Sequence, residues 1–229
     1  AKVLALDLDN TLWGGVLGED GLSGLKIGHD FPGNVYRRIQ AAAKTLKEQG
    51  VLLVLLTKNN PEDVSDAFAQ LDGLPLSLDD FVRVGAGWRP KHEALREIVA
   101  SLGLGLDSVV FVDDQEFERG QMTHFLPEVE VLPVSGDPLV ILEAIRDCPR
   151  LDALKLSAAD MSRSADYHSQ ARRDDLRAVS GTLDEFLHGL GLVARFADVA
   201  DSNIGRVVQM AAKTNQFNLT LRRHGEARF

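Results

Sequence analysis

Five short apolar segments, rich in valine and leucine, constrain the fold of this chain most strongly. Most of them do not alternate with polar residues, and strands that are buried on both faces have this pattern. Amphipathic segments separate most of them, so the sequence predicts an α/β class protein with a doubly wound parallel sheet. The expected strands are Val3–Leu8, Val51–Leu56, Phe81–Val84, Val109–Val112 and Val129–Val134.

Helix signals follow the same alternation. Asn60 can cap a helix and Pro61 suits its first turn, and Asp137-Pro138 begins another helix in the same way. Gly50 is placed to end the first long helix. Apolar residues at helical spacing predict helices over Gly33–Gln49, Pro61–Leu71 and Pro90–Leu102.

The pattern changes after about residue 150. Ser157–Arg177 is charged and polar and predicts an exposed helical connector, and Thr182-Leu183-Asp184-Glu185 matches a capping box that begins a short helix. We expect a strand over Leu192–Phe196 and a helix over Asn203–Lys213. The sequence therefore predicts a catalytic domain over residues 1–150 and, over 151–229, a connector with a partial C-terminal α/β module.

Both ends of the chain suggest an excised domain. Ala1 leads directly into a core strand, and Phe229 comes soon after a new element, Phe217–Leu221.

Charge and cysteine content narrow the class of protein. The formal net charge of −9 argues against non-specific nucleic-acid binding. Charges interrupt the first apolar run too early for a signal peptide, and no run approaches the ~18 apolar residues of a membrane span. The single cysteine, Cys148, cannot form an internal disulfide, so we expect a reducing, cytoplasmic setting.

Asp7 and Asp9 follow the first expected strand. Alternation along a strand puts both on one side of its carboxyl end, where ligands of open α/β sheets bind. Two carboxylates beside a buried strand cost free energy unless something pairs with them, and a divalent cation would do so. The alternative is a pair of solvated turn residues.

Three other strand ends carry complementary groups. Thr57 follows the second strand, Lys91 opens the helix after the third, and Asp113-Asp114 follow the fourth. Each alone suits a turn or a solvated helix. Together they supply carboxylates for a cation, and a hydroxyl and an ammonium for a phosphate, which indicates one phosphoryl-transfer site.

This set of residues resembles the haloacid dehalogenase-type (HAD) phosphotransferase superfamily over about residues 1–135. The matching motifs are Asp7-Leu8-Asp9-Asn10-Thr11, Thr57, Lys91 and Asp113-Asp114. The resemblance implies a HAD-like, Rossmannoid sheet with Mg²⁺ as cofactor. It makes Asp7 the nucleophile and the side chain of Asp9 the acid and base.

The resemblance also implies a ligand set. The Asp7 carboxylate, the Asp9 carbonyl and Asp113 would bind Mg²⁺, with Asp114 assisting. Thr57 and Lys91 would neutralise the transferring phosphoryl group, and Lys58 and Asn59 are candidates for the same phosphate site.

Longer stretches are similar to one branch of that superfamily, the FkbH-like proteins. They span nearly the whole chain: Asp7–Gly15 with Gly18–Gly21, Thr57–Pro61, Trp88–Lys91, Val112–Arg119 and Lys213–Arg223. The resemblance implies a glyceryl transferase/phosphatase of polyketide assembly. Such a protein takes 1,3-bisphosphoglycerate, removes the 3-phosphate and loads a three-carbon acyl unit on the phosphopantetheine thiol of an acyl carrier protein. The alternatives are a plain small-molecule phosphatase and a non-catalytic docking domain of a synthase.

One position departs from that branch. Its members commonly carry a cysteine four residues before the nucleophilic aspartate, where this chain has Val3. Transfer then goes directly to the carrier thiol, or Val3 is an engineered substitution, or the protein only removes phosphate. Cys148 is a candidate thiol nucleophile, against the alternative of a small, partly buried residue.

The remaining candidates are substrate and partner contacts. Gly14–Gly21 predicts a short flap with no large cap, and Trp13 either walls the pocket or belongs to the core. Asn215, Gln216, Asn218 and Arg222 orient substrate or satisfy a turn. An acidic carrier needs a basic face, and the candidates are Arg172, Arg173, Arg177, Lys213, Arg222 and Arg223, against the alternative of solvated surface charges.

Overall fold

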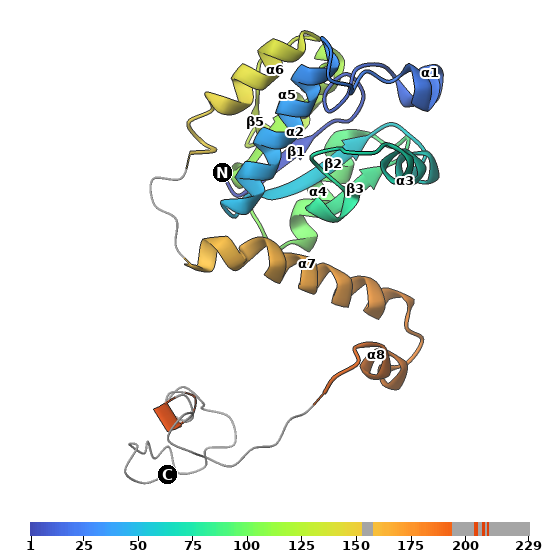
Figure 1. The fold of residues 1–229 in the computed structure, drawn as a ribbon. Coiled ribbons are helices and arrows are strands. Elements are labelled where there is room, and N and C mark those ends of the chain that lie inside the picture. The colour runs from blue at the N-terminus through green and yellow to red at the C-terminus, as the bar shows by residue number, and fades with distance from the viewer. Residues whose placement is uncertain (153–157, 194–203, 206–207, 209, 211–229) are drawn as a thin grey trace. The chain divides into compact units, whose positions relative to one another are not determined.

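The computed structural model describes residues 1–152, 158–193, 204–205, 208 and 210. The chain divides into two compact units, Ala1–Val179 and Ser180–Phe229. The first contains the sheet and its flanking helices, and the second contains α8 (Leu183–Gly189) (Figure 1). The domain boundary that the composition predicts at residue 150 stays a prediction.

A five-stranded parallel sheet forms the centre of the first unit. Its order is β3-β2-β1-β4-β5, so β1 lies between β2 and β4. Leu6 at the end of β1 is in register with Leu55 on one side and Val112 on the other. The predicted doubly wound parallel sheet is therefore confirmed. The strands are β1 (Val3–Leu6), β2 (Leu52–Thr57), β3 (Phe81–Ala86), β4 (Val109–Val112) and β5 (Glu130–Val131).

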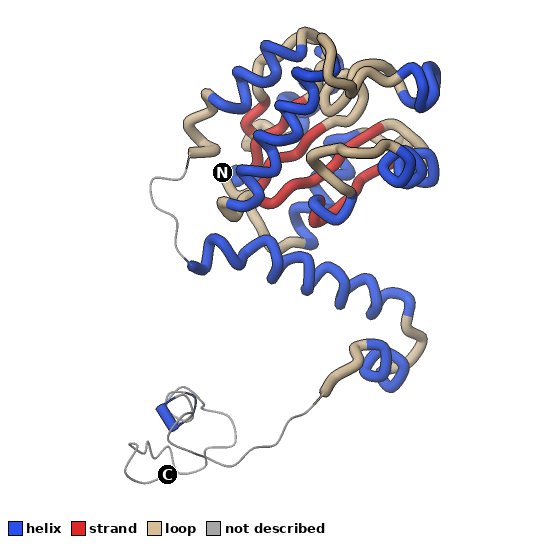
Figure 2. The backbone as a smooth tube through the Cα atoms, in the orientation of Figure 1, coloured by secondary structure: helices blue, strands red, loops and turns tan. Residues whose placement is uncertain are grey.

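Helices cover both faces of this sheet (Figure 2). One apolar cluster joins the sheet to α2, α3 and α6, and a second joins it to α4 and α5. Alternate residues of β1 enter the two clusters, Leu6 the first and Ala5 the second, and both are fully buried. The bounds are α1 (Leu17–Gly24), α2 (Gly33–Glu48), α3 (Pro61–Gln70), α4 (Lys91–Ser101), α5 (Glu116–Phe125), α6 (Pro138–Arg146) and α7 (Ala158–Val179).

The first strand is shorter than the apolar run predicts. It ends at Leu6 because the chain turns out of the ladder at Leu8, whose carbonyl accepts from Leu12 N–H at 2.8 Å. Asn10 lies in the left-handed region of the backbone, with φ +52°, which ends any extended geometry. At the sheet edge, the expected strand Val129–Val134 pairs only over Glu130–Val131.

The helix signals give mixed results. Asp137 caps α6 by accepting from Leu139 N–H at 2.9 Å, and the capping box of Thr182 and Glu185 is present at α8. Asn60 precedes α3 but its side chain caps no backbone group. The connector is helical as predicted, yet it is not exposed throughout, because Ala171 of α7 is buried in the second cluster.

Several C-terminal predictions fall beyond the described residues. Leu192 and Val193 are not in a strand, and the rest of Leu192–Phe196 lies outside the description, as does Phe217–Leu221. Within Asn203–Lys213, the described residues 204, 205, 208 and 210 are helical. Of the helices in the described ranges, none combines the length and apolar character needed to cross a membrane.

The buried carboxylate of Asp80 supports the turn before β3, and its removal should destabilise the fold. Lys47 Nζ lies 2.5 Å from Asp80 Oδ1, and Ser77 N–H donates to Oδ2 at 2.8 Å. Burial alone would raise the pKa of Asp80, but these hydrogen bonds outweigh it and hold the pKa below the ordinary 3.8. We expect Asp80→Asn to lower the free energy of unfolding by about 1–3 kcal/mol at pH 7.

Urea titrations from pH 7 into acid measure this difference. A lowered pKa means that the stabilisation is complete above pH 3.8 and is lost as the pH falls through the lower folded value. The two proteins should therefore converge only below about pH 4. Equal stability at pH 7 would contradict the assignment.

Candidate active site

Four strand ends bring charged and polar side chains to one edge of the sheet. Asp7 directly follows β1, Thr57 is the last residue of β2, and Asp113 directly follows β4. Lys91 is the first residue of α4, which follows β3. Because all strands are parallel and β1 is central, these groups surround the end of β1, as the sequence predicts.

Lys91 and two aspartates form a buried ionic cluster. Lys91 Nζ lies 2.5 Å from Asp7 Oδ1 and 2.7 Å from Asp113 Oδ2. The three side chains are 5%, 3% and 0% exposed. Burying charges is costly even when they are paired, so such a cluster is weak evidence for stability and stronger evidence for a functional site.

The same place has the donors for a metal ion. Carboxylate oxygens of Asp7, Asp113 and Asp114 lie within 4.8 Å of one another. Asp114 Oδ1 is buried and has no hydrogen-bond partner. Three carboxylates against the single ammonium of Lys91 leave negative charge uncompensated, and an all-oxygen donor set suits Mg²⁺. The residues therefore fit a divalent cation.

The pKa values in the cluster are shifted by burial and by the neighbouring charges. Burial raises the pKa of Asp7 well above its ordinary value; Lys91 opposes this rise and Asp113 adds to it. Burial and the charge of Asp113 raise the pKa of Asp114 to about 6. Burial would lower the pKa of Lys91, but Asp7 and Asp113 outweigh it and raise it. The lysine therefore stays charged.

The carboxylate of Asp9 lies outside this cluster and is held by other donors. Its Oδ1 accepts from Trp13 Nε1 at 2.9 Å and from Leu17 N–H at 3.2 Å, and its Oδ2 accepts from Asn59 Nδ2 at 2.8 Å. The Asp9 carboxylate is therefore not one of the three that cluster, and its carbonyl is the ligand that the resemblance implies. Trp13 is fully buried, so it belongs to the core and also orients Asp9.

The segment that follows β2 is ordered by side-chain bonds. Asn59 Nδ2 also donates to Thr57 Oγ1 at 2.8 Å, so one amide links Thr57 to Asp9. Lys58 is engaged elsewhere: its Nζ lies 2.5 Å from Glu118 Oε1 and 5.9 Å from the ring centre of Phe117. Thr57 and Asn59 are thus buried near the cluster, whereas Lys58 is paired with α5.

The predicted flap is short and glycine-dependent. Between β1 and α2 the chain forms loops and the eight-residue helix α1. Gly14 pairs with Lys26 through backbone hydrogen bonds, and a Cβ at Gly14 would lie 2.8 Å from Cε2 of Tyr36. Gly15 has φ +99°, a conformation that side chains disfavour.

The candidate thiol of Cys148 is remote from the ionic cluster of Lys91, Asp7 and Asp113. Cys148 is buried in the first apolar cluster, and two residues later the backbone carbonyl of Arg150 accepts a hydrogen bond from the Ala1 ammonium before β1. That is the end of β1 opposite Asp7. Val3, also on β1, is fully buried.

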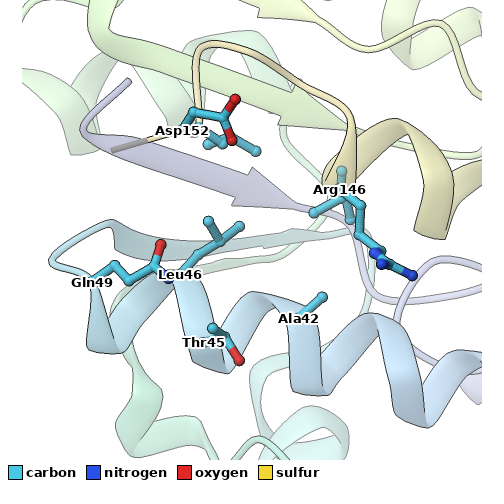
Figure 3. A pocket seen from close by; sticks show the side chains of 8 residues that line it. Ala42, Thr45, Leu46, Gln49, Arg146 and Asp152 are labelled. Carbon is cyan, nitrogen blue, oxygen red and sulfur yellow. The ribbon is translucent and has the colours of Figure 1, made fainter. Parts of the chain in front are cut away.

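A cavity of about 320 Å³ lies at the C-terminal ends of α2 and α6 (Figure 3). The described residues that line it include none of the predicted site residues: they are Ala42, Thr45, Leu46, Gln49, Ile145, Arg146, Leu151 and Asp152.

Only some of the residues predicted to contact a partner or substrate lie among the described residues. Arg172, Arg173 and Arg177 are exposed on α7, and the exposed Asp174 and Asp175 lie between them, so this helix carries mixed charge. The other candidates lie outside the described residues: Lys213, Asn215, Gln216, Asn218, Arg222 and Arg223.

Sequence reasoning gave no role to two residues of α5. Arg119 Nη1 donates to the carbonyls of Asp113 and Asp114 at 2.8 and 2.7 Å. Glu118 is 3% exposed and pairs with Lys58. Both belong to the Val112–Arg119 stretch that resembles FkbH-like proteins. Spacing in the sequence cannot tell which distant segment a charged helix residue will meet.

The fold and the cluster define the class: an α/β protein with the site chemistry of a metal-dependent phosphatase. A solved structure of the N-terminal part of BF1531 from Bacteroides fragilis, containing a phosphatase domain complexed with Mg, is similar to this chain. The two are 35% identical with a TM-score of 0.64, over 67% of this chain. The match covers 41% of the other chain, less than half of its length. No family model and no curated protein matches.

Mg²⁺ should stabilise the protein through this cluster. At a concentration 100 times Kd, a ligand of the native state adds about 2.7 kcal/mol of stability. We expect Mg²⁺ to raise the Tm, and Asp113→Asn to abolish that rise because it removes a fully buried carboxylate from the cluster. Thermal unfolding with and without Mg²⁺ measures the effect, and Asp72→Asn, at an exposed position, is the control. An unchanged Mg²⁺ response in Asp113→Asn would contradict the metal site.

Proposed function

We propose that this chain is a Mg²⁺-dependent phosphatase that works through an aspartyl-phosphate. The observation that carries the proposal is the buried set of Asp7, Asp113, Asp114 and Lys91 at the carboxyl edge of the parallel sheet. The Mg-bound phosphatase domain of BF1531, similar over two thirds of this chain, supports it.

The reaction begins at Asp7. A carboxylate oxygen of Asp7 attacks phosphorus, the bond from phosphorus to the ester oxygen breaks, and that oxygen leaves with a proton from Asp9. Water then attacks phosphorus and gives a proton to Asp9, and the bond to Asp7 breaks to release inorganic phosphate. The acid and the base are the same residue, so Asp9 ends as it began.

The surroundings of Asp9 fix the orientation of its side chain. Three donors, from Trp13, Leu17 and Asn59, hold its carboxylate in one orientation within the loop that follows β1. The link from Asn59 to Thr57 couples this orientation to the end of β2, where the phosphoryl group would be gripped.

The ammonium of Lys91 and the hydroxyl of Thr57 would neutralise the charge of the phosphoryl group. Lys91 is held at the first turn of α4, where backbone N–H groups add to its attraction for phosphate. In the bound state its ammonium and the Thr57 hydroxyl would contact the phosphoryl oxygens. Mg²⁺, held by Asp7, the Asp9 carbonyl, Asp113 and Asp114, would stabilise the charge that develops on these oxygens.

Substitution of the nucleophile tests this proposal. Asp7→Asn keeps the shape of the side chain but removes the attacking carboxylate, so we expect phosphate release to fall by at least 10³-fold, on the scale of other lost nucleophiles. Phosphate release from a generic aryl phosphate, with Mg²⁺ present, measures it. Wild-type-like release by a folded Asp7→Asn protein would remove Asp7 from this role.

For the natural substrate we propose a phosphoglyceryl group, as the FkbH-like resemblance suggests. The carrier thiolate would attack the acyl carbon of 1,3-bisphosphoglycerate, the bond to the C1 phosphate would break, and a thioester would form. The phosphatase site would hydrolyse the 3-phosphate. The short flap supports access for an acceptor on a long phosphopantetheine arm.

Direct transfer to the carrier thiol is the favoured route. Position 3 is fully buried and lies four residues from Asp7, a distance of about 13 Å along a strand. Cys148 is 5% exposed near the other end of β1. Neither position offers an accessible thiol beside the buried cluster.

Intact-protein mass spectrometry of a carrier protein tests this finer proposal. After incubation with a system that generates 1,3-bisphosphoglycerate, we expect a glyceryl adduct on the carrier, and the same adduct with Cys148→Ala, because that thiol is not used. A phosphoglyceryl adduct would mean that transfer comes first. Free phosphate without any adduct would reduce the function to that of a plain phosphatase, and no turnover of any phosphate ester would favour a docking domain.

A further inference from the structure

The first turns of α5 contact both segments that flank the end of β1. Glu118 pairs with Lys58 in the segment after β2, and Arg119 bonds to the segment after β4. Because β2 and β4 are the two neighbours of β1, adjacent residues of one helix tie together both sides of the site.

Arg119 acts on the metal-binding segment through the backbone. One guanidinium nitrogen donates to the carbonyls of both Asp113 and Asp114, the residues that supply two of the three clustered carboxylates. The side chain of Asp113 is further fixed because its Oδ1 accepts from Gln115 N–H at 2.9 Å. Arg119 therefore fixes the backbone from which these two carboxylates extend.

Glu118 acts on the other segment. Its side chain is 4% exposed and its carboxylate lies 2.5 Å from Lys58 Nζ, so Glu118 is buried beneath a lysine whose side chain is 38% exposed. Lys58 lies between Thr57 and Asn59, and Asn59 bonds to both Thr57 and Asp9. A shift of Lys58 would therefore move Thr57, which would bind the phosphate, and Asn59, which orients the Asp9 carboxylate.

We propose that Glu118 and Arg119 are positioning residues with separate tasks: Arg119 sets the metal carboxylates, and Glu118, through Lys58, sets Thr57, Asn59 and Asp9. The proposal rests on the proposed function. Losing such supporting partners typically costs 10–100-fold in metal affinity, and small misplacements of reacting groups cost about 10²-fold in rate.

The separation of the two tasks is the test. Titration calorimetry of the full chain measures the affinity for Mg²⁺ alone, and then for inorganic phosphate with Mg²⁺ present. We expect Arg119→Met to weaken Mg²⁺ binding by about 10–100-fold and Arg119→Lys to recover part of it. Glu118→Gln should leave Mg²⁺ affinity within about twofold of the wild type, yet weaken phosphate binding and lower kcat by about 10-fold or more at saturating Mg²⁺.

Two matched controls come from the neighbouring helix α4. Arg96 also donates to a carbonyl, that of Phe125 at the end of α5, and Glu97 forms an exposed pair with Arg89. Arg96→Met and Glu97→Gln should change neither affinity. If Glu118→Gln folds poorly, the exchange Lys58→Glu with Glu118→Lys restores the pair in reverse and should recover phosphate affinity.

A purely structural role gives a different result. In both Arg119→Met and Glu118→Gln, the affinities for Mg²⁺ and for phosphate would then fall together, in proportion to the loss of Tm. That result would overturn the proposal. Unchanged Mg²⁺ affinity in Arg119→Met would overturn it as well. If the wild type binds Mg²⁺ but hydrolyses no phosphate ester, the proposed function fails alone, since the two binding measurements still decide on the positioning residues.

Discussion

The rest of the site depends on one ammonium group buried among carboxylates. Lys91 reaches Asp7 and Asp113 across the carboxyl edge of the sheet, from the first turn of α4. Removing one partner of a buried pair typically costs 3–5 kcal/mol, because the other charge is left uncompensated. A fold that keeps this arrangement accepts an electrostatic cost that apolar residues would avoid. The arrangement makes sense when a cation and a phosphate complete it.

The sheet explains why these groups can meet. A parallel sheet with β1 at its centre brings together the carboxyl ends of β1, β2 and β4, although Asp7, Thr57 and Asp113 are far apart in sequence. The apolar residues behind them fill both faces of the sheet and exclude water. Exclusion of water strengthens the pairing of Lys91 and also shifts the pKa values of Asp7 and Asp114 upward.

The sequence was sufficient for the parts of the site that lie at strand ends. Continuous apolar runs predicted the parallel sheet, and residues just beyond the runs, such as Asp7 and Lys91, are at the cluster as expected. It could not predict contacts that depend on side-chain direction. The pairing of Lys58, a candidate for the phosphate site, with Glu118 is one such contact, and the bonds from Trp13 and Asn59 to the Asp9 carboxylate are others.

The most direct test of the central claim is a crystal structure of the protein with Mg²⁺ and beryllium fluoride, a mimic of a phosphoryl group on aspartate. The account predicts beryllium bonded to Asp7, a cation bound by Asp7, the Asp9 carbonyl and Asp113, and the Lys91 ammonium turned from the carboxylates to a fluoride. An empty cluster at saturating concentrations of both, with Lys91 still on Asp7 and Asp113, would contradict it.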